Sequence, residues 1–171
     1  MLNIAFVGAL YNPKGLQTIY RLTSDKSLLV NWFSIGWITS DYIEPLVNVE
    51  VYGPYKSRLE LYDFLDINNI DLVILPNECP ETFSYVMSEI WEYGLPILGT
   101  DRGAIESRIS ESQCGWVCNP LNMEVMIKYL INNRNELYKM YSIVEHYKVP
   151  SIDTMYKCYM EIYDNCISCN V

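Results

Sequence analysis

Short apolar runs alternate along the chain with longer segments of mixed polarity, and the two kinds predict different elements. Apolar runs bounded by Gly, Pro, Asn or Asp are typical of strands buried on both faces of a sheet. Such runs predict strands at residues 3–9, 28–35, 47–52, 71–76, 96–100 and 115–118. The segments between them predict helices at 13–23, 57–67, 82–93 and 103–109, and a helical region from 123 to about 166 that breaks near Pro150.

The segment at 82–93 has the clearest helical pattern. Its apolar residues have the spacing of a helix that packs one face against a sheet: Phe83, Val86, Met87, Ile90 and Trp91. We expect this face to be buried. The opposite face then carries Glu81, Tyr85, Ser88 and Glu89.

Regular alternation of strands and helices predicts an α/β fold. We expect a Rossmann-like, doubly wound parallel sheet of about six strands, with right-handed crossovers and helices on both faces. Residues 1–171 form a single domain in this interpretation, and residues 131–171 form a helical C-terminal extension. Ligands of such sheets bind beyond the carboxyl ends of the central strands. Residues 9–15 and 76–84 are therefore where chemistry is expected.

Composition and charge exclude several classes of protein. The chain has 171 residues, half of them hydrophobic, which excludes a disordered chain. Lys and Arg number 12 against 21 Asp and Glu, and the net charge of −9 argues against a nucleic-acid binder. The first eight residues lack the basic leader of a signal peptide, and no apolar stretch has the length of a membrane span. We expect a cytoplasmic protein, for which peripheral association with a membrane surface stays open.

Six cysteines raise the question of a metal site. Cys114 with Cys118 and Cys166 with Cys169 loosely resemble paired ligands, but the first pair falls in a predicted strand and the chain has one His. We favour packing for Cys114 and Cys118, a frayed end for the other pair, and no bound metal.

The chain after the fourth predicted strand has the features of an anion site. A helix start there offers free amides and the positive end of its dipole, and Ser84 adds a hydroxyl. Glu81 and Glu89 are eight residues apart, which places them within about 80° of each other around a helix. Such carboxylates can bind a sugar and a ribose diol, or they can simply stabilise the dipole and face solvent. Lys14, after the first strand, is either a phosphate ligand or an exposed lysine.

A family resemblance favours the functional interpretation. The segment ETFSYVMSEIWEYGLPILGT at 81–100 resembles the signature of retaining glycosyltransferases of family 4 (group 1), which have the GT-B fold. That signature contains two Glu and a Phe, here Glu81, Glu89 and Phe83, followed here by Gly94, Pro96, Thr100, Asp101, Gly103 and Glu106. Residues 6–8 with 14–15 are similar to the first strand and lysine loop of the C-terminal domain, and 115–120 to its last strand and turn. The resemblance covers residues 3–130.

The resemblance implies a domain that binds a nucleoside-diphosphate sugar. Glu81 would contact the transferred sugar, Glu89 the ribose, and Lys14 the leaving diphosphate. The backbone amides from Phe83 to Tyr85 would bind the same diphosphate, and the loop at 52–55 would hold the base. The full expected donor set is Gly8, Lys14, Tyr52, Gly53, Glu81, Thr82, Phe83, Ser84, Tyr85 and Glu89. The implied enzyme is a hexosyltransferase of polysaccharide or glycoconjugate synthesis, without metal or other cofactor.

Two positions depart from the family pattern. Ala9 stands where many members carry an Arg, so leaving-group stabilisation would rest on Lys14, the helix end and Arg102. Ser84 stands where a Gly is common. Each change alters the expected diphosphate site.

A full GT-B enzyme has two such domains, and the chain resembles only the C-terminal one. We expect the N-terminal acceptor lobe to be absent from the chain and supplied in cis or in trans. A catalytically inactive nucleotide-sugar-binding or assembly module is the alternative. A flavodoxin-like receiver is disfavoured, because strand one ends in Gly8-Ala9 rather than in acidic residues.

The C-terminal extension has an apolar stripe of its own. Residues at helical spacing there are Met155, Tyr156, Tyr159, Met160, Ile162 and Tyr163. This stripe either covers its own domain or is exposed for a partner, such as a second copy in a homodimer.

Overall fold

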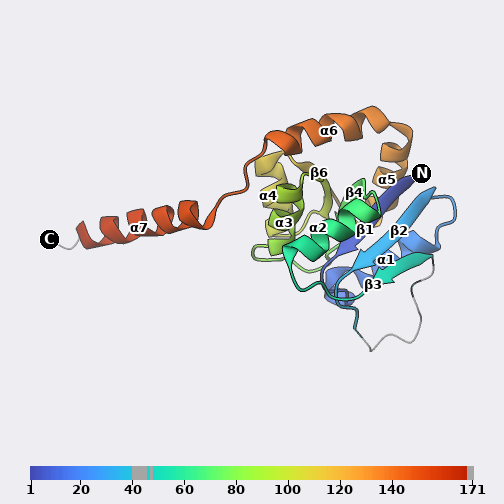
Figure 1. Ribbon diagram of the computed structural model, residues 1–171, viewed down its shortest axis with the longest axis horizontal. Coiled ribbons are helices and arrows are strands. Elements are labelled where there is room, and N and C mark those ends of the chain that lie inside the picture. Colours follow the sequence, from blue (N-terminus) through green and yellow to red (C-terminus); the bar gives the residue numbers. More distant parts are fainter. Residues whose placement is uncertain (40–45, 47, 169–171) are drawn as a thin grey trace.

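The computed structural model describes residues 1–39, 46 and 48–168 (Figure 1). The strands β1 (Leu2–Val7), β2 (Val30–Ile35), β3 (Val49–Tyr52), β4 (Leu72–Leu75), β5 (Ile97–Thr100) and β6 (Gly115–Cys118) form one sheet. Their order is β3-β2-β1-β4-β5-β6, and every neighbouring pair is parallel. The order reverses between β1 and β4, which makes this the point where a ligand is expected. The predicted Rossmann-like α/β fold is confirmed.

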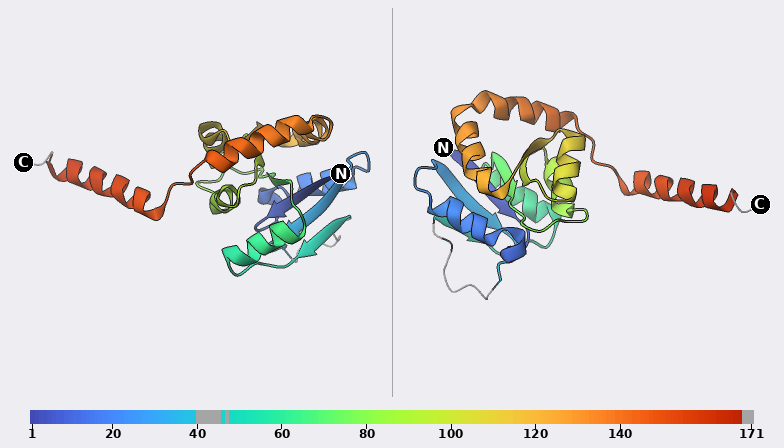
Figure 2. Two further views of the ribbon diagram at one scale, coloured as in Figure 1. Left: turned by 45° about the horizontal axis from the view of Figure 1, so that its top comes forward. Right: turned by 180° about the vertical axis from the view of Figure 1, so that it is seen from behind.

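The helices cover both faces of the sheet, as Figure 2 shows. These covering helices are α1 (Leu16–Ser24), α2 (Arg58–Ile67), α3 (Tyr85–Tyr93), α4 (Ala104–Ser112), α5 (Met123–Asn132) and α6 (Arg134–His146). A further helix, α7 (Ile152–Ser168), does not cover the sheet, and two 3₁₀ turns are η1 (Asn12–Lys14) and η2 (Pro120–Asn122).

Two apolar clusters hold the layers together. One face of the sheet packs against α2, α3 and α4. The other packs against α1 and α5. Helix α6 passes from one side to the other, because Leu137 belongs to the second cluster and Val144 to the first. Strands β1, β2, β4 and β5 are therefore mostly buried, as their apolar runs predict. The edge strand β3 is largely exposed, so the prediction that it is buried is wrong.

The start of α3 differs from the prediction. The helix begins at Tyr85 rather than Thr82, because Ser84 has a left-handed backbone with φ of 63°. Phe83 consequently lies outside the helix and is 46% exposed, so the expectation that it belongs to the buried stripe is wrong. Trp91 is buried as expected, and its Nε1 donates to the carbonyl of Cys114 over 2.9 Å.

The C-terminal helix α7 projects away from the sheet and its covering helices (Figure 1). The chain breaks between His146 and Ile152, as predicted near Pro150. Every side chain from 153 to 165 is exposed, so the apolar stripe does not cover its own domain. Among the helices that the structure describes, none is both long and apolar enough to cross a membrane.

The cysteines are distributed without a metal-binding group among the described residues. Cys114 is fully buried and packs in the core, as expected. Burial of the thiol, and to a smaller extent the negative charge of the nearby Asp101, raises the pKa of Cys118 to about 11. Cys79 and Cys158 are free and exposed. The side chains of Cys166 and Cys169 lie outside the described residues.

Candidate functional site

Two loops meet at the carboxyl ends of β1 and β4. Gly15, with φ of +84°, approaches the second loop so closely that a Cβ there would lie 1.9 Å from the carbonyl oxygen of Pro76. The carbonyl of Pro13 accepts hydrogen bonds from the amides of Glu78 and Cys79, at 3.0 and 3.1 Å. The loop after β1 is thus fastened directly to the loop after β4.

This junction brings Lys14 to Glu81. The Lys14 ammonium forms an ion pair with Glu81 Oε1, and Asn77 Nδ2 donates to the same oxygen over 2.6 Å. Asn77 is only 4% exposed, so it is a fixed donor. Partial burial lowers the pKa of Lys14 from its ordinary value, because desolvation disfavours the charged ammonium. The pair places one cation and one carboxylate side by side at the strand ends.

A cleft of about 490 Å³ opens beside this pair. It is lined by Tyr11, Pro13, Lys14, Cys79, Pro80, Glu81, Thr82, Phe83, Ser84, Tyr85 and Val86. The rings of Phe83 and Tyr85 lie on its wall with centroids 5.1 Å apart, and Tyr85 is 78% exposed. A cleft of this size, lined by charged side chains and aromatic rings, can take a small, charged ligand.

The N-terminus of α3 faces the cleft. Among the hydrogen bonds of the described residues, none is donated by the amides of Ser84, Tyr85 or Val86. Unpaired amides at a helix start, together with the helix dipole, favour an anion. Lys14 lines the same cleft. The arrangement is suited to phosphate.

Residues at and just before helix α4 form hydrogen bonds and close contacts with the loop at 81–84. The carbonyl of Glu81 accepts from the amide of Ala104 over 2.9 Å. Gly103 lies against Glu81 so closely that a Cβ would be 2.7 Å from its carbonyl oxygen. Arg108 donates to the carbonyls of Phe83 and Ser84 at 2.9 and 2.8 Å. The loop that carries the helix start is therefore anchored at both of its ends.

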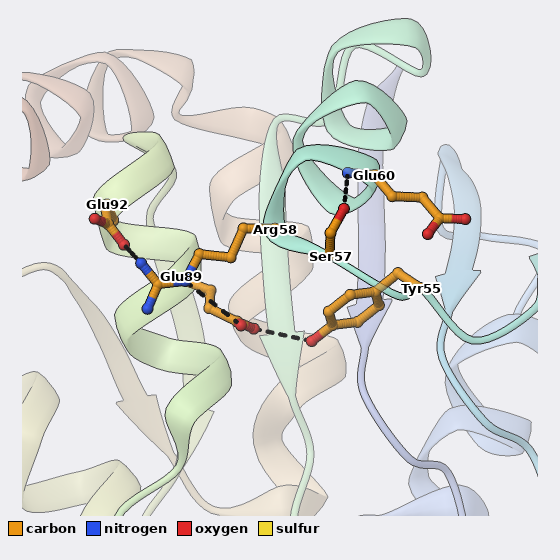
Figure 3. Close-up of polar contacts among 6 residues, drawn as sticks. All are labelled: Tyr55, Ser57, Arg58, Glu60, Glu89 and Glu92. Carbon is orange, nitrogen blue, oxygen red and sulfur yellow. Dashed lines mark hydrogen bonds and ion pairs between the residues drawn. The ribbon is translucent and has the colours of Figure 1, made fainter.

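Glu89 lies about one turn along α3 and has its own hydrogen-bond and ion-pair partners (Figure 3). The hydroxyl of Tyr55 donates to Glu89 Oε2 over 2.9 Å, and Arg58 Nε lies 3.9 Å from Oε1. Arg58 also contacts Glu92 at 2.6 Å. Burial, reinforced by the Glu89 carboxylate, raises the pKa of Tyr55 well above its ordinary value, so the phenol remains a donor.

The structure brings together six of the predicted donor residues at one cleft: Lys14, Glu81, Thr82, Phe83, Ser84 and Tyr85. Gly8 adjoins them, because a Cβ there would lie 3.4 Å from Val86. Glu89 does not line the cleft, although it is on the same helix.

The remaining predicted residues are directed elsewhere. Tyr52 packs edge-on against Phe64, with centroids 4.8 Å apart, and its hydroxyl donates to Asn68. The carbonyl of Gly53 accepts from Gly36 over 3.2 Å. Arg102 lies against Asp101, with Nε and Oδ1 3.3 Å apart, and does not line the cleft.

Three site residues were not predicted individually: Asn77, Tyr55 and Arg108. The sequence contains a signal for Asn77, because a polar residue shortly after a buried strand is expected near a ligand site. Tyr55 falls at the end of the loop expected to hold the base. Arg108 had no such signal, because its contacts are with residues 20 to 25 positions away.

Solved structures with the same architecture include glycosyltransferases. HepE from Anabaena, in complex with UDP and glucose, aligns over 94% of this chain and 48% of its own, with 15% identity and a TM-score of 0.74. A glycosyltransferase from Rickettsia africae aligns over 98% of this chain and 48% of its own, with 17% identity and a TM-score of 0.74. The C-terminal domain of LpcC, a group 1 family glycosyltransferase from Francisella tularensis, aligns over 84% of this chain and 82% of its own, with 16% identity and a TM-score of 0.64.

The fold is that of a GT-B C-terminal domain. The chain spans less than half of the HepE and Rickettsia africae proteins. No protein-family model and no curated protein matches the sequence.

Proposed function

We propose that this chain is the donor-binding lobe of a retaining glycosyltransferase, and that it binds a nucleoside-diphosphate sugar. The observation that carries the proposal is the meeting of Lys14 with the unpaired amides of α3 at the β1–β4 strand ends. The fold supports it, because HepE has this fold and is known in complexes with UDP and with UDP-glucose.

The diphosphate would lie at the start of α3. The amides of Ser84 and Tyr85 would donate to its oxygens, and Lys14 would neutralise its charge. Binding requires Lys14 to share or exchange its present partner, Glu81. Glu81 would then be free to accept hydrogen bonds from sugar hydroxyls, as the family resemblance implies.

The nucleoside would extend along α3 toward Glu89. A carboxylate can accept both hydroxyls of a ribose, and Tyr55 holds Glu89 in place on the side of the loop at 52–55. That loop would contact the base. Gly8 leaves room for the donor to pass close to the backbone between β1 and α3.

In the proposed reaction, the bond between the anomeric carbon and the diphosphate oxygen breaks, and its electron pair leaves with the diphosphate. Lys14 and the amides of α3 stabilise the charge that grows on this leaving group. The acceptor oxygen forms the new bond on the same face of the sugar, and its proton passes to the departing diphosphate oxygen. The acceptor would be bound mainly by an N-terminal lobe, in cis or in trans, in polysaccharide or glycoconjugate synthesis.

Calorimetric titration with UDP, ADP and GDP, and with their glucose conjugates, tests the proposal. We expect saturable binding of at least one, weakened by Lys14→Ala and by Glu89→Ala. Lys139→Ala is a matched control, because Lys139 pairs with Glu136 on α6, away from the cleft. Absence of binding for every nucleotide at millimolar concentration would overturn the proposal.

A catalytically inactive assembly module is the second candidate. It is favoured by Ala9, which leaves the β1 loop without a second phosphate cation, and by the pairing of Lys14 with Glu81. Nucleotide binding that is absent, or that survives both Lys14→Ala and Glu89→Ala, would favour this candidate.

A further inference from the structure

Arg108 lies behind the loop that forms the start of α3. Its guanidinium donates three hydrogen bonds, to the carbonyls of Phe83 and Ser84 and to the hydroxyl of Ser88, at 2.9, 2.8 and 2.8 Å. Its central carbon also lies 4.3 Å from the centroid of the Phe83 ring. Arg108 itself does not line the cleft. It contacts the carbonyls of the loop that lines the cleft but is not itself among the residues that line it.

These contacts fix the direction of the backbone amides. In a trans peptide the carbonyl of one residue and the amide of the next point in opposite directions. Because the carbonyls of Phe83 and Ser84 point at Arg108, the amides of Ser84 and Tyr85 point away from it. Ser84 and Tyr85 line the cleft, whereas Arg108 does not, so we infer that these amides point toward the cleft.

The same contacts hold an unfavourable backbone conformation. Ser84 has φ of 63° and ψ of 84°, in the left-handed region that favours glycine. A residue with a side chain keeps such a conformation only where its surroundings hold it. The Ser84 carbonyl is held by Arg108 and by the amide of Met87, at 2.8 and 3.2 Å.

We propose that Arg108 is a positioning residue for the diphosphate site: it aims the amides of Ser84 and Tyr85 into the cleft without touching the ligand. The inference rests on the proposed function, since it assigns a role at the same site. It predicts a specific pattern, in which loss of Arg108 weakens binding of a diphosphate but not of a ligand that lacks one.

Titration of the intact chain with inorganic pyrophosphate, with the nucleoside diphosphate that binds best and with its nucleoside tests this pattern. We expect Arg108→Gln to weaken both diphosphates by about tenfold, the size of one charge-assisted hydrogen bond, and to leave the nucleoside unchanged. Arg108→Lys retains the charge but cannot reach three acceptors, so we expect partial rescue. Arg21→Gln is the control, because Arg21 likewise donates to two backbone carbonyls, those of Pro120 and Leu121, away from the cleft.

A second variant separates positioning from direct contact. Ser84→Gly removes the backbone strain that Arg108 holds, so the tenfold effect of Arg108→Gln should shrink to about threefold or less in the Ser84→Gly background. A direct contact between Arg108 and the phosphate would give the same loss in both backgrounds, and that result would overturn the inference. If Arg108→Gln does not fold, the same comparison is made with Arg108→Lys.

The outcomes distinguish the two proposals. If the unaltered chain binds neither pyrophosphate nor any nucleoside diphosphate, the proposed function fails and the role of Arg108 fails with it. If the unaltered chain binds them and Arg108→Gln binds equally well, only the role of Arg108 is overturned.

Discussion

Glu81 and Glu89 are two carboxylates beside the same helix, and the chain holds them in different ways. Glu81 lies in the loop before α3 and is paired with a cation from another loop, Lys14, and with the buried amide of Asn77. Glu89 lies within the helix and is held by a neutral donor, Tyr55, with Arg58 at the longer distance of 3.9 Å. An anionic ligand would compete with Glu81 for Lys14. A neutral diol could add to Glu89 without displacing a strong ion pair.

The difference teaches which end of the site depends on charge. At Glu81 the pairing depends on how closely two loops approach, and a diphosphate would change it. At Glu89 the geometry depends on one hydrogen bond from a phenol that stays protonated. Changes at the first end should therefore have larger effects than changes at the second.

Gly15→Ala should have the largest effect, because it breaks the junction that brings Lys14 to Glu81. The added Cβ would meet the Pro76 carbonyl oxygen at 1.9 Å, and the backbone at φ of +84° disfavours a side chain. We expect a loss of about 3 kcal/mol or more in the free energy of unfolding, and a fall of about 6–12 °C in the melting temperature. Thermal unfolding followed by circular dichroism measures it.

Gly53→Ala is the matched control, because nothing lies within 4 Å of the Cβ that it would add. An equal fall in melting temperature for the two variants would show that the close approach of the loops is not what holds the junction.

Lys14→Ala should come next, and it should act on the ligand more than on the fold. Removing one preorganised charge from the leaving group should cost about 2–4 kcal/mol of transition-state stabilisation in the assembled enzyme, or about 1.5–3 kcal/mol of diphosphate binding. Calorimetry with a nucleoside diphosphate measures the second quantity. An unchanged affinity would mean that Lys14 is committed to Glu81 alone.

Tyr55→Phe should have a smaller effect, confined to the Glu89 end. It removes one hydrogen bond to Glu89, worth about 0.5–1.5 kcal/mol, and leaves the ring in place. We expect weaker binding of a nucleoside diphosphate and unchanged binding of pyrophosphate. Tyr159→Phe on α7 is the control, and a loss of pyrophosphate affinity in Tyr55→Phe would contradict the separation of the two ends.

The smallest expected effect is a difference in reactivity between the thiols of Cys79 and Cys118, which can be measured in the unaltered protein. Cys79 is exposed on the cleft wall, whereas the pKa of Cys118 is raised to about 11, so only about one Cys118 in a thousand is a thiolate at pH 8. Iodoacetamide should label Cys79 before Cys118, and a bound diphosphate should slow the labelling of Cys79. Peptide mass spectrometry over time measures both rates, and faster labelling of Cys118 would contradict the burial seen here.

Much of the fold follows from the sequence, because its signals are local. Each buried strand is a short apolar run, and residues such as Trp91 fall at the spacing of a helix face that packs on a sheet. The start of α3 was mispredicted because its cause is not local. Phe83 and Ser84 are held outside the helix by Arg108, which belongs to another helix.

In the candidate site, too, some features could be predicted from the sequence and others could not. The cluster of Lys14 with Glu81 could be predicted, since both follow neighbouring strands whose ends meet. The partners of each carboxylate could not. Tyr55 and Glu89 are 34 positions apart, and only the packing of α2 and α3 on the same face brings them into contact.

Because α7 projects into solvent, we expect it to unfold independently of the sheet and its covering helices. Tyr147 packs on Trp91 with centroids 5.4 Å apart, and Val149 still packs on the core, but every described side chain beyond 152 is in solvent. A helix of 17 residues whose side chains from 153 to 165 are all exposed relies mainly on its own backbone hydrogen bonds, which in water are a marginal source of stability. The amides of α7 should therefore exchange with deuterium rapidly, through local helix–coil opening. The amides of β1 and β4 should exchange slowly, because their exchange requires global unfolding. A partner that buries the apolar stripe of α7 would slow the deuterium exchange of the α7 amides, and this slowing would reveal the partner.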